Sequence, residues 1–345
     1  MNTLRFLLKL PVYEAFKFFE LPVVPMPLAY VYFLTTRCNS KCINCNLWKT
    51  KPNPELNTNQ WLKIIEGIGS TPDWITMTGG EPFLKEGFDE ILSHVLRFNQ
   101  PRVVCIPTNG SMPKLIVSQL KTALKVPGNY EIIVNISVDE VGERHDELRG
   151  LKGNFSKLKQ TIRWLKELQT QDARLKIGVN TVISQANIAR LYKIYDYVTR
   201  VLQPDDYIFE TAQQRFELKT GSKRFGIDKQ KLEHFLKQLI KENKRQVIHK
   251  RFIGFIKTLI RIRYYHHILN PKPQRCNAGI LSCYIMPNGD VIACGVLGDK
   301  IANISKYGLD MKKLWRSPTA KSKRAKFRKR KCSCELAALF YINQL

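Results

Sequence analysis

Six strand-like segments alternate with helix-like segments between residues 28 and 211, and this alternation constrains the fold more than any other feature of the chain. Short apolar runs are followed by longer runs whose apolar residues recur with helical spacing. Because parallel strands need a crossover connection, the alternation predicts an α/β fold with a parallel sheet. We expect this sheet to curl into a partial (β/α)6, TIM-like barrel. The expected strands are 29–35, 74–78, 102–108, 132–138, 175–183 and 207–209, and the expected helices are 58–68, 88–98, 113–124, 155–168 and 188–201.

The composition on either side of this core divides the chain into four parts. Residues 1–27 form an amphipathic N-terminal segment, 28–211 the barrel, 212–275 a basic helical connector, and 276–345 a small C-terminal domain rich in cysteine. The first segment, with Leu4, Leu7, Leu8, Leu10, Phe16, Phe18 and Phe19, predicts a helix that either caps the core or lies on a membrane surface.

Two further basic segments lie towards the C-terminus. Residues 246–269 predict a basic amphipathic helix that either packs on the barrel or binds lipid or a partner. The run Lys321–Lys331 holds eight basic residues in eleven, which is typical of a solvated helix face.

The charge balance indicates which partners the chain attracts. Its 56 Lys and Arg residues against 29 Asp and Glu give a net charge of +27. Such a charge favours nucleic acid, anionic lipid or a phosphorylated substrate without choosing among them. No apolar run reaches the roughly 18 residues of a spanning helix, and the N-terminus lacks a cleavage site for secretion. We therefore expect a cytoplasmic protein, with the inner face of the membrane as the alternative, and read its nine cysteines as reduced thiols and metal ligands.

Three cysteines with the spacing C-x3-C-x2-C follow the first expected strand, at Cys38, Cys42 and Cys45. A cubane iron–sulfur cluster takes four thiolates, so three leave one iron open to a small molecule. In βα barrels this end of a strand lies on the catalytic face. Structural zinc is the competing interpretation, but it usually needs four closed ligands, and the sequence nearby offers no fourth. These three cysteines are the candidate catalytic and metal-binding residues.

The second expected strand ends in Thr-Gly-Gly-Glu-Pro, residues 78–82. Gly79 and Gly80 would let the backbone approach a ligand closely, and Pro82 suits the first turn of a helix. By itself the motif could be only a turn. Because this motif lies one βα unit after the three cysteines, the two together form a much more specific pattern than either alone.

Together the two motifs resemble the radical S-adenosylmethionine (SAM) superfamily, over about residues 28–210. The resemblance implies a [4Fe-4S] cluster whose open iron chelates the amino nitrogen and carboxylate of SAM. It also implies that Gly79, Gly80 and Glu81 hold the methionyl amine. A low-potential donor such as flavodoxin or ferredoxin would supply one electron. The C–S bond of SAM would then break to give a 5′-deoxyadenosyl radical, which abstracts hydrogen from an unactivated C–H bond.

Further residues match the superfamily one by one. Ser137 closes the fourth strand and would meet the SAM ribose or carboxylate. Arg149, twelve residues later, would pair with that carboxylate through its guanidinium fork; a surface ion pair is the alternative. Asn44 stands where the superfamily often has an aromatic residue. Weaker matches are Asn180 towards the ribose, Ile208 or Phe209 towards adenine, and Thr108 and Asn109 in the pocket wall.

The C-terminal segment resembles the SPASM/twitch appendages of the same superfamily. The resemblance rests on Cys276-Asn-Ala-Gly, a Pro-Asn-Gly turn inside an expected hairpin at 284–293, Leu314-Trp-Arg-Ser317 and a final Cys-x-Cys pair. It implies one auxiliary [4Fe-4S] cluster that passes electrons to or from a substrate radical, with zinc as the alternative. The basic residues near Cys332 should raise its reduction potential. The implied ligands are Cys276, Cys294, Cys332 and Cys334, whereas Cys283 and Cys105 are expected to pack as core residues.

These features predict a radical SAM oxidoreductase that functionalises a C–H bond, and three substrate classes compete. Peptides are common for SPASM-type enzymes, but about 27 residues before the barrel are too few for a leader-binding domain there. The apolar, basic segments 1–27 and 246–269 favour a membrane-associated or lipid-linked substrate. Nucleic acid suits the charge but is not favoured, because we find no RNA-binding module. A non-catalytic iron–sulfur relay or redox sensor is the alternative from another class, although it would need neither the Gly-Gly-Glu-Pro motif nor Ser137 and Arg149.

Overall fold

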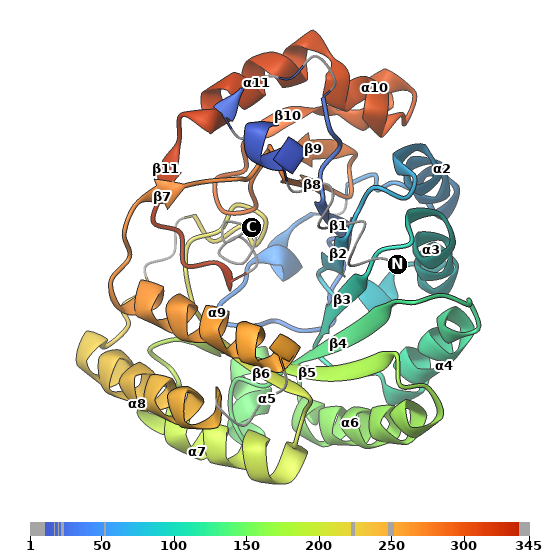
Figure 1. The fold of residues 1–345 in the computed structure, drawn as a ribbon. Coiled ribbons are helices and arrows are strands. Elements are labelled where there is room, and N and C mark those ends of the chain that lie inside the picture. Colours follow the sequence, from blue (N-terminus) through green and yellow to red (C-terminus); the bar gives the residue numbers. More distant parts are fainter. Residues whose placement is uncertain are drawn as a thin grey trace.

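The computed structural model describes residues 11–16, 18–19, 21, 24–51, 53–221, 225–247 and 252–337. Leu4, Leu7, Leu8 and Leu10 of the expected N-terminal helix lie outside these residues. A nine-stranded sheet with the order β10-β9-β8-β1-β2-β3-β4-β5-β6 forms the centre of the molecule (Figure 1).

The barrel portion of this sheet is parallel throughout and follows the order of the chain. Apolar runs with few charges form these strands because both of their faces are covered. The six-unit α/β architecture expected from the alternation is confirmed. The strands are β1 (Ala29–Thr35), β2 (Trp74–Gly79), β3 (Val103–Thr108), β4 (Glu131–Ser137), β5 (Leu175–Ile183) and β6 (Asp206–Thr211).

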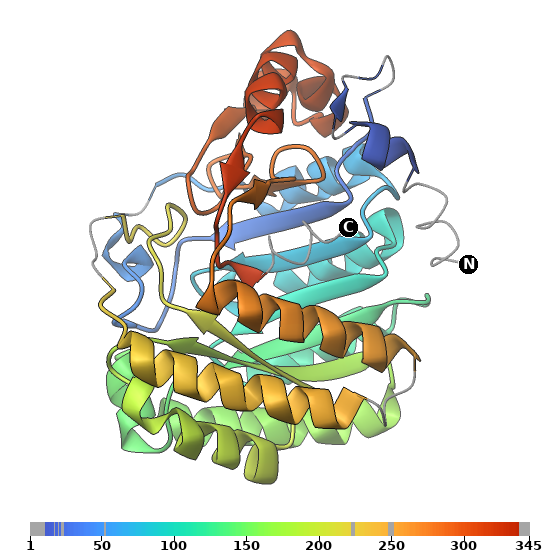
Figure 2. The ribbon, with the colours of Figure 1, turned by 60° about the vertical axis from the view of Figure 1, so that its left-hand side comes forward.

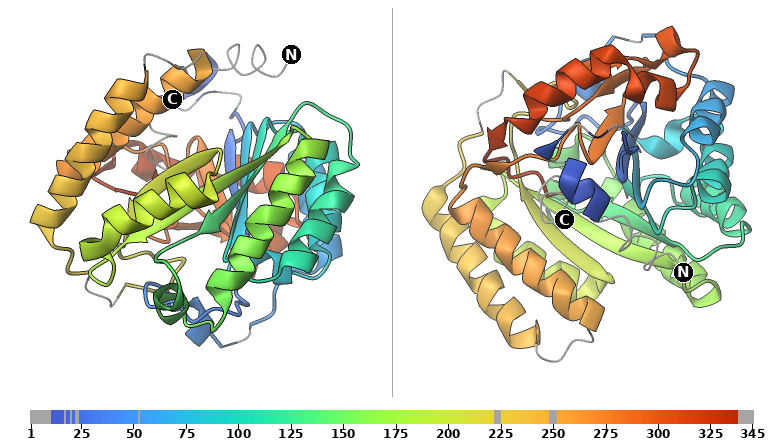
Figure 3. Two further views of the ribbon diagram at one scale, coloured as in Figure 1. Left: turned by 90° about the horizontal axis from the view of Figure 1, so that it is seen from below. Right: turned by 45° about the horizontal axis from the view of Figure 1, so that its top comes forward.

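Helices cover the outer face of these strands (Figure 3). They are α2 (Thr58–Ile68), α3 (Phe88–His94), α4 (Pro113–Leu124), α6 (Asn154–Gln171) and α7 (Leu191–Tyr197); α3 and α7 continue as π-helical turns, Val95–Asn99 and Val198–Leu202. The short α5 (Glu143–Arg149) was not expected from the sequence, since seven mostly polar residues carry no apolar period. Single 3₁₀ turns lie at Leu47–Lys49, Pro82–Leu84, Ile188–Arg190 and Ile304–Tyr307.

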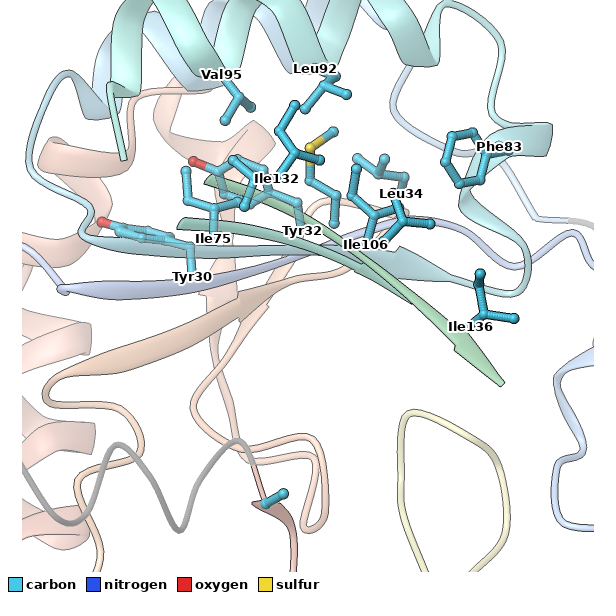
Figure 4. Packing of buried hydrophobic residues seen from close by; sticks show 14 of the residues in the cluster. Tyr30, Tyr32, Leu34, Ile75, Phe83, Leu92, Val95, Ile106, Ile132 and Ile136 are labelled. Atoms are coloured by element: carbon cyan, nitrogen blue, oxygen red, sulfur yellow. The ribbon is translucent and has the colours of Figure 1, made fainter. Parts of the chain in front are cut away.

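Alternate residues of each strand build the core between the sheet and these helices (Figure 4). Tyr32, Ile106 and Ile132 are fully buried and meet Leu92 and Val95 of the α3 segment. Because side chains alternate across a strand, the intervening residues line the inner face of the sheet. The inner face is where the polar residues of the candidate site lie.

The C-terminal segment extends the barrel sheet. Strand β8 (Ser282–Ile285) pairs parallel with β1, and the expected hairpin to β9 (Asp290–Ile292) is confirmed. β10 (Lys300–Asn303) completes the sheet, while β7 (Gln274–Arg275) and β11 (Lys331–Cys332) form a separate two-stranded pair. The division of the chain into four parts stays a prediction.

Helices α10 (Met311–Arg316) and α11 (Pro318–Arg328) follow β10. The expectation that the basic run of α11 forms only a solvated face was wrong for two residues. Arg324 is fully buried and stacks on Trp315, and Arg328 is 8% exposed and donates to the Phe16 carbonyl. These cations anchor the described N-terminal residues, of which Phe16 is buried whereas Phe18 and Phe19 are exposed.

The connector forms two adjacent helices, α8 (Lys229–Val247) and α9 (Phe252–Leu269), beside β6 (Figure 2). Helix α9 buries Tyr264 and Tyr265 against the body, which confirms the expected packing. It also exposes Phe255, Ile256 and Leu259, each by 38–44%. Among the described residues no helix is long and apolar enough to cross a membrane.

Candidate functional site

The loop that carries Cys38, Cys42 and Cys45 leaves the end of β1 and is fixed by backbone hydrogen bonds to α5. Lys41 donates to the Arg149 carbonyl (2.9 Å), and Ile43 donates to the Leu148 carbonyl (3.0 Å). These bonds explain why the unexpected α5 matters: it holds the outer edge of the cysteine loop.

Each of the three sulfurs accepts a hydrogen bond from a different donor. The backbone N–H of Ser40 points at Cys38 (3.4 Å), that of Leu47 at Cys45 (3.4 Å), and Nη1 of Arg149 at Cys42 (3.5 Å). Burial raises the pKa of Cys38 to about 12, so iron binding must displace its proton. Donors directed at sulfur are one of the means by which proteins stabilise and tune iron–sulfur clusters, so this donor set fits a cluster.

Gly79 and Gly80 have a structural task that the sequence did not reveal. A Cβ at Gly79 would lie 2.4 Å from the Thr35 carbonyl oxygen, and one at Gly80 would lie 2.2 Å from that of Arg37 and 2.9 Å from the Cys38 Cβ. The Gly80 and Glu81 amides donate to these same two carbonyls. Glycine is therefore needed at 79 and 80 for the close approach of the cysteine loop itself, whatever else binds there.

Glu81 is buried beneath the loop with both carboxylate oxygens occupied. Oε1 accepts from Thr108 (2.8 Å), and Oε2 accepts from the Asn109 amide (2.9 Å). Burial raises the pKa of Glu81 to about 7. The Asn109 side chain in turn donates to Asn39 (2.7 Å) and Ser40 (3.0 Å), so Thr108 and Asn109 position the loop. Contact of Gly79, Gly80 or Glu81 with a methionyl amine stays a prediction.

Ser137, Asn180 and Ile208 lie side by side on the inner face. They are register partners across β4, β5 and β6, so three of the expected SAM contacts form one row. Sequence reasoning missed Glu210, which accepts from the Asn180 side chain (3.2 Å) and from the Ala337 amide (3.1 Å). A charged residue at an inward position of a strand was the available signal.

The Arg149 side chain lies beside Cys42, where it pairs with Asp139 at 3.2 Å as well as donating to the Cys42 sulfur. Burial alone would lower the pKa of Arg149, but Cys42 and Asp139 raise it, so the guanidinium remains charged. The alternative of a surface ion pair is wrong, since the two side chains are only 11% and 4% exposed. A role for Arg149 towards the SAM carboxylate stays a prediction.

The four C-terminal cysteines expected to share a cluster come together. Cys276, Cys294, Cys332 and Cys334 pack in one group with Leu336. Burial raises the pKa of Cys276 to about 11 and that of Cys334 to about 12. Backbone amides donate to three of the sulfurs: Ala278 to Cys276, Val296 and Leu297 to Cys294, and Leu336 to Cys334.

Ligand spacing bears on the choice between zinc and a cluster at both sites. No three His, Cys, Asp or Glu side chains in the described part of the chain converge closely enough to share one metal ion. Zinc takes its ligands in one tetrahedron, whereas each thiolate of a cubane binds a separate iron, and the choice between them at the C-terminal site stays a prediction. The remaining two cysteines differ: Cys283 is fully buried in the core as expected, but Cys105 is half-buried on the inner face, because its neighbours Val104 and Ile106 take the core-facing positions.

The segment after Cys332 crosses to α9 and β6. The Tyr264 hydroxyl donates to the Glu335 carbonyl (2.8 Å), the His267 ring bonds the Cys334 carbonyl (3.0 Å), and Thr211 bonds the Glu335 side chain. Helix α9 thus positions Cys334 and the residue after it.

A turn after β6, residues 215–220, links the two cysteine sites. Asn46 donates to the Leu218 carbonyl (3.0 Å), and Glu217 donates to the Gly295 carbonyl (3.1 Å). The Glu217 side chain is buried against Arg215, and a Cβ on Gly295 would lie 2.7 Å from its carboxylate carbon. The two loops that carry Cys45 and Cys294 are therefore tied to one short segment.

The chain is similar in sequence to known proteins, two of them from Bacillus subtilis. It is 28% identical over 272 residues to the sporulation killing factor maturation protein SkfB of Bacillus subtilis, covering 78% of this chain and 60% of SkfB. It is also 28% identical over 291 residues to the subtilosin biosynthesis protein AlbA of the same organism, covering 79% and 56%. The chain therefore spans little more than half the length of these relatives.

Solved structures share the fold. That of anSMEcpe with bound AdoMet and the Kp18Cys peptide matches with a TM-score of 0.62 at 16% identity, covering 88% of this chain and 84% of that one. SuiB of Streptococcus suis bound to precursor peptide SuiA matches with a TM-score of 0.61 at 17% identity, covering 94% and 71%. Residues 32–197 match the model of the radical SAM superfamily, whose enzymes use a [4Fe-4S] cluster and SAM. With its cysteine loop, glycine turn and parallel half-barrel in place, the part of the chain over residues 32–197 is a radical SAM domain.

Proposed function

We propose that this chain cleaves SAM reductively at the Cys38–Cys45 loop and removes a hydrogen atom from a C–H bond of a peptide. The observation that carries the proposal is the pairing of a three-cysteine site with a four-cysteine site through the 215–220 turn. Cys38, Cys42 and Cys45 would hold a cluster with an open iron for SAM, and a cluster at the second site would be able to accept an electron from a substrate radical.

The residues of the chain have separable tasks in this proposal. Cys38, Cys42 and Cys45 hold the first cluster, and Arg149 keeps a positive charge beside it. The row Ser137, Asn180 and Ile208 faces the same space and would orient the ribose and adenine of SAM. Cys276, Cys294, Cys332 and Cys334 would hold the second cluster, which Tyr264 and His267 of α9 keep in place.

We favour a peptide as the substrate class because SkfB is named for maturation of the sporulation killing factor and AlbA for biosynthesis of the bacteriocin subtilosin. The fold match to anSMEcpe and SuiB, both solved with peptides, is consistent with this class.

The decisive experiment is anaerobic incubation of the reconstituted protein with SAM and dithionite. We expect 5′-deoxyadenosine to form, and to vanish in Cys42→Ala. If none forms with wild type, the alternative of a non-catalytic electron relay or redox sensor is favoured. Peptide masses from cells that express wild type or Cys42→Ala then test the substrate class. One peptide should be lighter by the mass of the removed hydrogen in cells with the wild type, and should keep its full mass in cells with the variant.

A membrane-associated or lipid-linked substrate is the second candidate. The exposed Phe255, Ile256 and Leu259 of α9, together with Lys257, present an apolar and basic surface. Flotation with anionic vesicles at low salt tests it: this candidate requires co-flotation, and Phe255→Ser/Leu259→Ser should abolish it. If the wild type stays at the bottom of the gradient while the vesicles float, this candidate is excluded.

A further inference from the structure

A mixed aromatic and basic surface lies directly outside the cysteine loop. It consists of Trp48, Lys49, Phe216, Lys219 and Leu297, which we name the Trp48 patch. Trp48, Phe216 and Leu297 are 38%, 41% and 53% exposed, so they present apolar surface beside the two lysines. Lys49 lies over the Trp48 ring at 5.0 Å, and Lys219 lies over the Phe216 ring at 4.6 Å.

Hydrogen bonds hold the two halves of this patch together although they are far apart in sequence. The Asn46 amide donates to the Leu218 carbonyl, and its side chain donates to the Lys219 carbonyl (2.9 Å). The Phe216 amide donates to the Val296 carbonyl (3.0 Å), next to Leu297. Figure 2 shows the loop after β1 beside the loop after β6. The patch is therefore a built surface of three segments.

The patch also lies one hydrogen bond from a cluster ligand. The Trp48 indole N–H donates to the Cys45 carbonyl (3.1 Å). The backbone amide of the preceding residue, Leu47, donates to the Cys45 sulfur. A half-exposed aromatic ring so closely connected to a cysteine of the first site offers a short route from solvent to that site.

Charge indicates what can dock there. The patch presents two lysines on a chain of net charge +27, so an acidic protein would be attracted. The opposite edge of the cysteine loop, formed by α5, exposes two acidic side chains, Glu143 and Glu147, and one basic side chain, Arg144, so it would attract the same partner less. A small apolar centre with charges around it suits a weak electron-transfer encounter, which buries little surface.

From these observations we infer that the Trp48 patch is the docking surface for a small, acidic, low-potential electron-transfer protein. The inference rests on the proposed function, since only a reducible cluster at Cys38, Cys42 and Cys45 needs such a partner. One electron leaves the reduced flavin or iron–sulfur centre of the donor, passes by way of Trp48 and reduces the cluster. No bond forms or breaks in the protein, and the donor is oxidised by one electron.

The test uses a flavodoxin as the probe and a charge-reversal variant of the loaded protein, Lys49→Glu/Lys219→Glu. We expect the affinity for flavodoxin and the rate at which its reduced flavin is oxidised to fall by about tenfold at low ionic strength, with the difference shrinking in high salt. The matched control is Lys237→Glu/Lys241→Glu, which changes the net charge equally in a basic depression on α8. It should leave both quantities close to wild type.

Several results would overturn the inference. Equal losses in the patch and control variants would show that net charge alone attracts flavodoxin. An equal loss of cluster reduction when dithionite replaces flavodoxin would show that the patch variants damage the first site itself. In both of these cases, formation of 5′-deoxyadenosine by the wild type would leave the proposed function intact. A single-stranded RNA that binds with the same dependence on Lys49 and Lys219 would assign the patch to nucleic acid instead.

The role of Trp48 as a route is tested separately. At saturating flavodoxin, Trp48→Ala should slow flavin oxidation, whereas Trp48→Phe, which keeps an aromatic ring, should retain more of the rate. A rate in Trp48→Ala equal to wild type would exclude the tryptophan from the path of the electron.

Discussion

The backbone of Gly80 lies so close to that of Arg37 that a single methyl group on Gly80 would come within 2.2 Å of the Arg37 carbonyl oxygen. The Gly-Gly turn after β2 thus fixes the backbone of the cysteine loop after β1. Glu81 strengthens this junction, since its amide donates to the same carbonyl (2.8 Å).

Gly80→Ala should therefore displace the cysteine loop and prevent cluster assembly at the first site. We expect iron in the reconstituted protein to fall from about eight atoms per chain towards about four. Gly67→Ala is the matched control: its Cβ would meet no described atom within 4 Å, and it should raise the free energy of unfolding by about 0.5–1 kcal/mol. Full iron content in Gly80→Ala would refute this account of the turn.

Removal of the Arg149 guanidinium should destabilise the fold. Arg149→Gln leaves Asp139 buried without its ion-pair partner, which costs about 3 kcal/mol in free energy of unfolding. Arg163→Gln breaks an exposed pair with Glu167 and should cost less than about 0.5 kcal/mol. Chemical denaturation of the two variants measures the difference, and equal costs would mean that Asp139 is solvated.

The auxiliary site can be emptied without touching the first one. We expect Cys294→Ala to lose about four irons per chain while 5′-deoxyadenosine still forms with dithionite. Cys283→Ala, in the apolar core, should keep all the iron and lose only about 1 kcal/mol of stability. Retention of both clusters in Cys294→Ala would remove Cys294 from the ligand set.

Arg330 should raise the reduction potential of the auxiliary cluster. It is close enough to lower the pKa of Cys276, although Asp299 offsets part of its charge. Positive charge favours the reduced, more negative cluster, so Arg330→Gln should shift the potential downward, and by more than Lys331→Gln, whose side chain is exposed. Protein-film voltammetry measures both, and an upward shift in Arg330→Gln would contradict the argument.

His145 should make the protein less stable in mild acid. Burial and the nearby Arg149 lower its pKa from 6.5 to about 3, while Asn154 opposes the shift. Below pH 6.5 the unfolded chain binds a proton at this ring and the folded chain does not. Stability is therefore lost as the pH falls towards 3, by up to about 1.4 kcal/mol per pH unit, and none is lost above 6.5.

The measurement is the free energy of unfolding of wild type and His145→Gln at pH 7.5 and pH 5.5. Wild type should lose about 1.4 kcal/mol more than the variant between these values. Identical losses would show that His145 does not titrate differently in the two states.

Much of the fold could be predicted because its signals are local. The limits of α2, α4, β1 and β5 agree with the sequence, since apolar spacing and a capping residue such as Asn57 act over a few residues. Helix α5 and the burial of Arg324 were missed. The first lacks an apolar period, and the second depends on Trp315 and Phe16, which reach Arg324 only in the folded chain.

In the candidate site, too, local patterns predicted some features and missed those that depend on long-range contacts. Motif spacing pointed to Cys38, Cys42, Cys45 and the glycine turn, because these residues recur at short intervals, whereas the set Cys276, Cys294, Cys332 and Cys334 rested on a family resemblance. It could not reveal that Glu81 is fully hydrogen-bonded, that Glu210 joins Asn180, or that Cys105 faces inward. Those facts depend on which strand lies beside which.

The sequence by itself determined the order of strands and helices and the motifs that resemble the radical SAM superfamily, since these depend on short runs of neighbouring residues. Only the tertiary structure decided that β8 lies against β1 and that Asn46 meets Lys219 across 173 residues. Packing of the whole chain sets such long-range contacts. These contacts join the two cysteine sites and create the Trp48 patch, which no local sequence pattern could predict.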